Sequence, residues 1–262
     1  MRKYLTLFRV NWQNSLQYRA STVIYIVGYG LYISVLLYLW HSVYQSGKQM
    51  GAYSVSDMMT YYLLQMIMNT VILSYISWDL IDQIREGFFS NFLIKPVNTL
   101  AYWFTINLSG KLLEIIYIGT TLLVLYLTFG KYFVLPPDWK TGGIFLICLF
   151  LALCLSFLLD FCIAMIAFWL IQVRVFKFML QYIIFFFAGA ILPLDLFPEW
   201  LRGIIYALPF QYIIFVPIQI YLGKISVSWD FFLRELAWIF FFLVLARLML
   251  ARGIRRYEAV GG

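Results

Sequence analysis

Long apolar runs separated by short polar breaks make up most of this chain. Each run is close to the roughly 20 residues that a helix needs to cross a bilayer, and most charged residues stand between the runs. The pattern predicts an all-α polytopic membrane protein, with one transmembrane domain over residues 1–262. Six transmembrane helices are expected, at about residues 22–40, 58–78, 105–130, 143–171, 178–194 and 231–250.

The first 20 residues follow a different pattern from these spans. Leu5, Phe8, Trp12 and Leu16 recur at spacings of three and four, and polar residues occupy the rest of the helix circumference. Such spacing is typical of an amphipathic helix. We therefore expect residues 1–20 to form a helix that lies in a membrane surface.

Prolines interrupt the apolar sequence between the fifth and sixth spans. Neither FPEWLRGIIYAL nor FQYIIFVPIQIYLG is long enough to cross a bilayer. Because backbone N–H and C=O groups at membrane depth must be hydrogen-bonded, a pair of re-entrant half-helices over residues 196–224 is favoured over an extended loop. The prolines are Pro193, Pro198, Pro209 and Pro217.

The connection between the second and third spans is short, charged and partly apolar. It reads SWDLIDQIREGFFSNFLIKPVNTL, and Gly87 and Pro96 bracket a predicted short helix within it. Asp79, Asp82 and Glu86 precede that helix, where the helix dipole favours acidic residues. The apolar face of the helix consists of Phe88, Phe89, Phe92 and Leu93, with Ser90, Asn91 and Lys95 around it.

Two interpretations of this connection remain open on spacing alone. It is either an amphipathic connector that rests on the membrane or a contact for a soluble partner. The two readings place the apolar face against different surroundings, lipid in one case and protein in the other.

Composition and charge support a membrane protein and set its orientation. Of 262 residues, 64% are hydrophobic and 12% are charged, against about 25% charged in soluble proteins. The net charge of +7 comes from basic residues that stand singly at the ends of apolar runs and cluster at the termini. That distribution is typical of topology signals, so no nucleic-acid partner is expected. Placing both termini in the cytoplasm puts most basic residues inside, with the proline-broken pair facing out.

No familiar catalytic or cofactor motif occurs in the sequence. None of the four Gly-Lys pairs has the spacing of a phosphate-binding loop, and HExxH and GxSxG are absent. The cysteines Cys148, Cys154 and Cys162 lie in one apolar run without a CxxC pair, which favours small buried side chains over a metal or redox site. We expect no catalytic, cofactor-binding or metal site in this chain.

Charges within the predicted spans carry more information, since each costs roughly 2.5–3.5 kcal/mol at the bilayer centre on insertion scales. Lys111 in the third span and Asp160 in the fourth lie at similar depths near the inner edge of the membrane. The two side chains could form an ion pair between helices. The alternative partner of Lys111 is Glu114, one turn further along the same helix.

The order of these parts resembles the permease subunits of type-2 ATP-binding-cassette (ABC) exporters. That family has an amphipathic N-terminal helix, six spans, a cytoplasmic coupling helix between spans two and three, and an outward re-entrant helix pair before the last span. The stretch IREGFFSNFLIKPVNTLAYWF matches the family at Glu86, Gly87, Leu93, Lys95 and Pro96. The more specific stretch GAILPLDLFPEWLRGIIYALPFQYIIFVPIQIYLG matches at Gly189, Pro193, Phe197, Pro198, Trp200, Leu201, Leu208, Pro209 and Pro217.

The resemblance implies roles for both stretches. Residues 83–96 would be the coupling helix that contacts an ABC ATPase subunit, through Glu86, Gly87, Phe88, Phe89, Asn91, Leu93, Lys95 and Pro96. The re-entrant pair would form an outward gate, with Pro193, Phe197, Pro198, Trp200, Leu201, Pro209 and Pro217. The resemblance also implies a cell-membrane complex of two permease chains, identical or paralogous, surrounded by lipid and bound to two separate ATPases that hold ATP and Mg.

The small permeases most similar to this chain imply export of an amphipathic or hydrophobic substrate, such as a drug (multidrug efflux), a peptide, a toxic cation or a lipid-like molecule. A carbohydrate or lipid-linked glycan exporter is an alternative, because 21% of the residues are aromatic. A stand-alone ion-coupled transporter is another, although it requires inverted repeats and mid-membrane carboxylates. A membrane-embedded transferase would need convergent polar residues at one depth.

Overall fold

The computed structural model describes residues 2–17, 19–47, 50–94, 96–225 and 228–257, and these ranges are helical apart from their connections. The helices are α1 (Arg2–Gln17), α2 (Arg19–Gln45), α3 (Val55–Val71), α4 (Ile76–Arg85), α5 (Phe89–Leu93), α6 (Thr99–Phe129), α7 (Trp139–Met165), α8 (Val173–Phe187), α9 (Glu199–Ala207), α10 (Phe215–Tyr221) and α11 (Trp229–Arg256).

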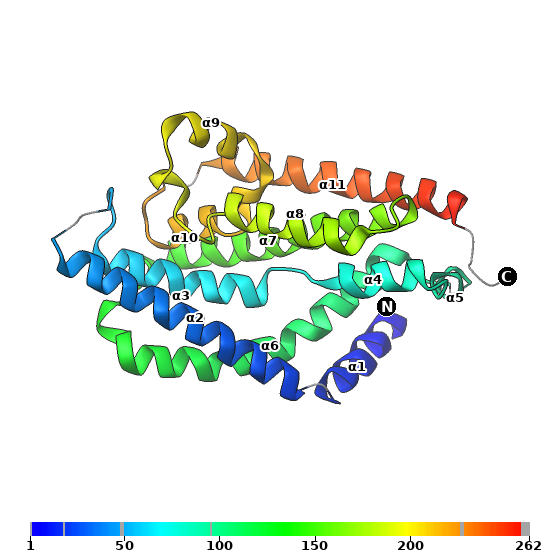
Figure 1. Ribbon diagram of the computed structural model, residues 1–262, viewed down its shortest axis with the longest axis horizontal. Helices are drawn as coiled ribbons and strands as arrows, with labels where there is room; N and C mark the ends of the chain where they lie inside the picture. The colour runs from blue at the N-terminus through cyan, green and yellow to red at the C-terminus, as the bar shows by residue number, and fades with distance from the viewer. Residues whose placement is uncertain (1, 18, 48–49, 95, 226–227, 258–262) are drawn as a thin grey trace.

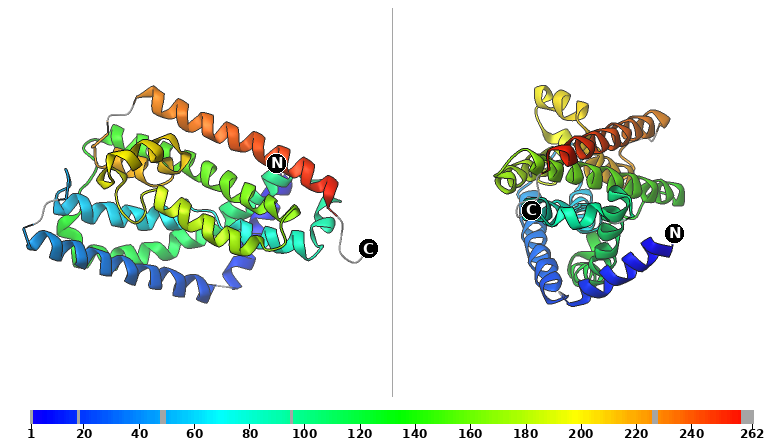
Figure 2. Two further views of the ribbon diagram at one scale, coloured as in Figure 1. Left: turned by 45° about the horizontal axis from the view of Figure 1, so that its top comes forward. Right: turned by 90° about the vertical axis from the view of Figure 1, so that its right-hand side faces the viewer.

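The long helices run roughly side by side along the longest axis of the molecule (Figure 1). We call the end that carries α5, the start of α1 and the end of α11 the α5 end. The opposite end, which carries α9 and α10, is the α9 end (Figure 1). α1 packs against α6 and lies at the edge of the bundle at an angle to the long helices (Figure 2). The expected N-terminal helix is therefore present, and its position on a membrane surface stays a prediction.

Five helical stretches are long and apolar enough to cross a membrane: residues 23–45, 55–85, 99–132, 139–168 and 229–256. They lie where the first, second, third, fourth and sixth spans are expected. The fifth predicted crossing, at residues 178–194, is not confirmed, because α8 has 15 residues, or about 23 Å of helix, against roughly 30 Å of hydrocarbon. α8 ends just before Gly189, whose φ of 85° takes the chain out of the helical conformation.

The helices divide into a central pair and an outer set. Most residues of α3 are buried, as is the second half of α7. Among the described residues of α11, by contrast, only Glu235, Ala246 and Gly253 are buried. The outer helices thus offer apolar side chains to lipid, and the second membrane crossing, made by α3 and α4, runs through the centre of the protein.

A separate cluster of buried side chains holds the α5 end together. It includes Leu80 of α4, Phe89 and Phe92 of α5, and Phe168 after α7. Gly253 of α11 touches this cluster so closely that a Cβ atom there would overlap the ring of Phe168.

Replacement of Gly253 by alanine is expected to destabilise the protein. The added methyl group must displace Phe168 within a packed cluster, and overpacking of this kind costs about 1–3 kcal/mol. The midpoint of thermal unfolding of the purified protein in detergent should fall by several degrees. Gly119→Ala on α6 is the matched control, because a Cβ atom there meets nothing within 4 Å; equal midpoints for the two variants would contradict the expectation.

Candidate functional site

The second membrane crossing is not a continuous helix. α3 ends at Val71, α4 begins at Ile76, and residues 72–75 between them are not helical. The break leaves backbone groups without their usual helical partners. Each such group costs several kcal/mol in a hydrocarbon environment unless another group bonds it. Side chains from three other helices therefore determine whether the break is stable.

Lys111 of α6 satisfies the end of α3. Its Nζ atom donates hydrogen bonds to the carbonyl oxygen of Thr70, at 2.7 Å, and to Oε2 of Glu114, at 2.8 Å. The side chain is almost fully buried. An ammonium group is favourable here because the exposed carbonyl groups give the C-terminal end of a helix a partial negative charge.

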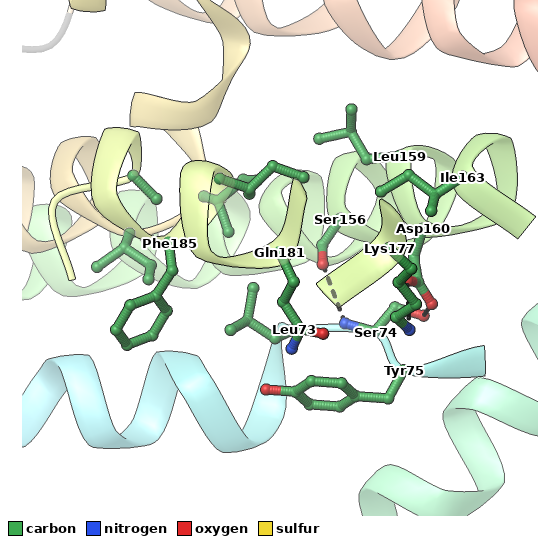
Figure 3. Close-up of a pocket in the computed structure, with 14 residues that line it drawn as sticks. Leu73, Ser74, Tyr75, Ser156, Leu159, Asp160, Ile163, Lys177, Gln181 and Phe185 are labelled. Atoms are coloured by element: carbon green, nitrogen blue, oxygen red, sulfur yellow. Dashed lines mark hydrogen bonds and ion pairs between the residues drawn. The ribbon is translucent and has the colours of Figure 1, made fainter. Parts of the chain in front are cut away.

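Asp160 of α7 satisfies the start of α4 in the complementary way. Its Oδ2 atom accepts a hydrogen bond from the backbone N–H of Ser77, at 2.9 Å, and its Oδ1 atom accepts one from the Ser77 hydroxyl. The hydroxyl of Ser156, one turn earlier in α7, accepts the N–H of Ser74 at 3.0 Å (Figure 3). A carboxylate is favourable at this position because the N-terminal end of a helix carries partial positive charge.

Lys177 of α8 provides the counter-charge for Asp160. Its Nζ atom lies 3.2 Å from Oδ1 of Asp160, also contacts the hydroxyl of Ser77, and lies 4.4 Å from the ring centre of Trp78. The Lys177 side chain is 1% exposed, and Figure 3 shows it directed toward Asp160 beside the break. A buried charge of this kind is tolerated when it is paired and hydrogen-bonded.

Of the two partners considered for Lys111 from the sequence, the structure shows Glu114 and not Asp160. Lys111 pairs with Glu114, as in the alternative considered from sequence, and Asp160 pairs with Lys177. Lys111 bonds the backbone before the break and Asp160 bonds the backbone after it. The two side chains are therefore held at opposite ends of the break and do not pair. Lys177 precedes the predicted fifth span of residues 178–194 by one position, so it was not counted among the charges within the membrane. A usable signal was the tight turn between α7 and α8, which brings residues at similar distances from it face to face.

A small cavity of about 40 Å³ lies beside the break. Ser74, Ser156, Asp160, Lys177 and Gln181 contribute polar groups to its lining (Figure 3). The volume is sufficient for a water molecule or two but not for an organic substrate. We therefore assign the polar cluster to the stability and movement of the broken crossing, not to substrate contact.

The segment after α4 forms a bend followed by the short helix α5. Gly87 has a φ of 84°, the left-handed conformation that commonly ends a helix and that glycine adopts without strain. Phe89 and Phe92 are buried, and the ring of Phe89 meets those of Phe168 and Tyr257. α5 is thus anchored to the protein by its aromatic side chains.

The predicted contact face of this segment needs one correction. Phe88 is 58% exposed and Leu93 is 39% exposed, but Phe89 is fully buried and cannot meet a partner. Ile94, which is 83% exposed, extends the outer face in its place. Glu86 is exposed as well. Lys95 lies outside the described residues, and the side chain of Asn91 is likewise not described.

Two polar contacts link the segment to other helices. Arg174 of α8 donates a hydrogen bond from Nε to Oδ1 of Asp82 at 2.8 Å, so Asp82 forms an ion pair in α4 instead of serving the start of α5. Lys3 of α1 donates to the carbonyl oxygen of Pro96 at 2.7 Å. The first contact therefore links α4 to α8, and the second links the segment after α5 to α1.

The proline-rich segment forms the two short helices α9 and α10 at the α9 end, and α9 begins directly after Pro198. Their predicted re-entrant position in the membrane stays a prediction. The hydroxyl of Tyr53 donates to Asp195 just before α9, at 2.8 Å, and receives a hydrogen bond from Gln219 of α10. Whether this pair forms an outward gate stays a prediction. Of its proposed residues, Pro193, Pro209 and Pro217 are buried, Phe197 and Leu201 are half-buried, and Pro198 and Trp200 are exposed.

A known protein family matches most of the chain. Residues 30–261 match the family described as "ABC-2 family transporter protein". No curated protein sequence matches the chain.

The pairing at the break can be tested with two double-mutant cycles. Asp160→Asn leaves the buried Lys177 without its counter-charge and is expected to cost roughly 3–5 kcal/mol of stability. Adding Lys177→Met should restore part of that loss, whereas adding Lys111→Met should not. Unfolding of the purified variants in detergent measures both cycles. A stronger coupling of Asp160 to Lys111 than to Lys177 would contradict the pairing described.

Proposed function

The chain belongs to the ABC-2 family of transporter proteins, and we propose that it is the permease subunit of an ATP-driven exporter. Members of this family are the membrane components of transporters and are not themselves catalytic. The matched region includes most of α2 and all of α3 to α11. We further propose that two permease chains, identical or paralogous, form the path together with two separate ATPase subunits, which hold ATP and Mg.

The exposed side of α5 is the observation that carries this proposal. Phe88, Leu93 and Ile94 face outward from a helix whose other side is fixed in the core by Phe89 and Phe92. Such a rigid apolar projection suits a hydrophobic groove on a soluble partner, where aromatic anchors supply much of the binding energy. In this proposal, the energy of ATP hydrolysis reaches the permease through this contact.

α4 offers a route from that contact to the centre of the bundle. It is ten residues long, begins at the break and ends at the Gly87 bend. A displacement of α5 would therefore move α4 as a unit, with residues 72–75 absorbing the change in backbone angles. Hinge segments in transporters work in this way, at the ends of otherwise rigid elements.

The orientation follows from the same assignment. We place the α5 end in the cytoplasm, which agrees with the inside bias of basic residues in the sequence. The described parts of α1 and α11 share that end (Figure 1). An even number of crossings is then required, so we propose that α8 and the residues that follow it complete a sixth. The substrate proposed is amphipathic or hydrophobic.

Charged substitutions on the exposed side of α5 are expected to uncouple the complex. Phe88→Asp and Ile94→Asp should each weaken the permease–ATPase complex by about 10-fold or more, since a buried anchor contributes on the order of 2 kcal/mol. ATP hydrolysis stimulated by the permease should fall in parallel. Co-purification and ATPase assays with the cognate ATPase in detergent measure the two effects.

Leu135→Asp is the matched control. Leu135 is 78% exposed but lies in the connection between α6 and α7, far from α5. Phe89→Asp is unsuitable, because a charge at this buried position would unfold the segment. The proposal fails if the Phe88 and Ile94 variants remain fully coupled, or if the purified chain transports substrate without any ATPase.

A further inference from the structure

A cavity of about 320 Å³ opens between α1, α4 and α6, near the α5 end. It is separate from the small cavity beside the break and lies on the other side of Tyr75. Its polar lining comes from three helices: Asn11 and Asn14 of α1, Asp79 of α4, and Asn107, Lys111 and Glu114 of α6. The volume is that of a small-molecule site.

The amide nitrogen Nδ2 of Asn107, in the lining, has no hydrogen-bond partner among the residues that the structure describes. Asn107 is 6% exposed. Most buried polar side chains in native proteins are hydrogen-bonded, to protein or to ordered water, so this amide group is available to a water molecule or a ligand in the cavity. Asn107 lies in the wall of the cavity, which gives such a partner room.

The charges of the lining do not cancel. Two carboxylates, Asp79 and Glu114, accompany one ammonium, that of Lys111, and Lys111 is already bonded to Glu114 and to Thr70. Asp79 is exposed and belongs to no ion pair of the described residues. A surplus carboxylate in a chain of net charge +7 favours a cationic ligand at this position.

The surroundings indicate that the ligand is amphipathic. Ile115 and Ile116 follow Glu114 on α6, and both are exposed apolar side chains on a helix that faces lipid. Tyr75 adds an aromatic ring to the lining, and the centre of that ring already lies 5.7 Å from the ammonium of Lys111 and 6.0 Å from that of Lys177. A headgroup in the cavity can thus keep its apolar tail in the membrane beside α6.

We propose that this cavity binds the ammonium headgroup of an amphipathic molecule taken from the adjacent membrane leaflet. The carboxylate of Asp79 holds the positive charge, and Nδ2 of Asn107 donates to an acceptor on the headgroup. The inference rests on the proposed export function, for which this cavity is the loading site. Tyr75 and Asp79 lie at the start of α4. A bound headgroup therefore contacts the helix whose other end leads into α5 through the Gly87 bend.

Direct binding tests the site without ATP. The full-length chain is purified in dodecyl maltoside micelles, which carry no ammonium group, and titrated with radiolabelled dodecyltrimethylammonium. Saturable binding is expected for the native protein. Asp79→Asn should raise the Kd about 10-fold. Asn107→Leu should leave the Kd of this probe unchanged, because a trimethylammonium group offers no acceptor to Nδ2, but it should weaken the binding of a headgroup that carries a phosphate. Dodecyl sulfate, which has the same tail and the opposite charge, should not compete.

A steric pair of variants separates the cavity from a general effect on α6. A Cβ atom at Gly110, which lines the cavity, meets nothing within 4 Å, and the same holds for Gly119, two turns away and outside the lining. Gly110→Leu should therefore fill the cavity and abolish binding, while Gly119→Leu should bind like the native protein. Thermal unfolding midpoints confirm that both variants are folded.

Two lipid additions identify the source of the headgroup. Phosphatidylethanolamine, which carries an ammonium, should displace the probe if a lipid is the natural occupant, and phosphatidylglycerol should not displace it in either case. The inference is overturned if Asp79→Asn and Gly110→Leu bind like the native protein, or if dodecyl sulfate competes equally. If the probe binds as expected but the chain shows no functional coupling to an ATPase, the proposed function is refuted and the binding site is retained.

Discussion

A helix that is interrupted inside a membrane must find new partners for its backbone, and this requirement organises the centre of the protein. The broken crossing formed by α3 and α4 exposes carbonyl groups on one side and N–H groups on the other. Lys111 bonds the first set and Asp160 the second. Each charge has the sign that the nearby helix end prefers, and each has its own counter-charge, Glu114 or Lys177. Lys111, Glu114, Asp160 and Lys177 are therefore organised around the break.

The same arrangement makes α4 a distinct mechanical part. Polar contacts hold its first turn at the break, and the aromatic cluster of Phe89 and Phe168 holds the segment beyond its last turn. Arg174 adds a link from Asp82 to α8. In the proposed function, a contact at α5 and a ligand beside Asp79 would be coupled through this helix.

The positions of the long helices and of the proline-bounded short helices were predictable from the sequence. The break in the second crossing and its stabilising contacts were not, because they depend on residues far apart in the chain. Apolar runs located the five long crossings, and prolines located the two short helices α9 and α10. The break contains neither proline nor glycine, and its stabilising residues Lys111 and Asp160 are 41 and 83 positions away from their backbone partners. In α5, five residues are too few for spacing to decide whether Phe88 or Phe89 faces the core. The length of α8 depended on the conformation of Gly189, which no pattern of hydrophobicity reveals.

The placement of the counter-charges also has a consequence for the order in which the chain enters the membrane during synthesis. Lys111 and Glu114 stand on one helix, so α6 can leave the translocation machinery with its charge already paired. Asp160 must wait for Lys177, made 17 residues later on α8. The backbone at the start of α4 must wait in turn for Asp160. The second crossing can therefore reach its final form only after the fourth crossing and α8 have been made, which ties biogenesis of the early chain to its later half.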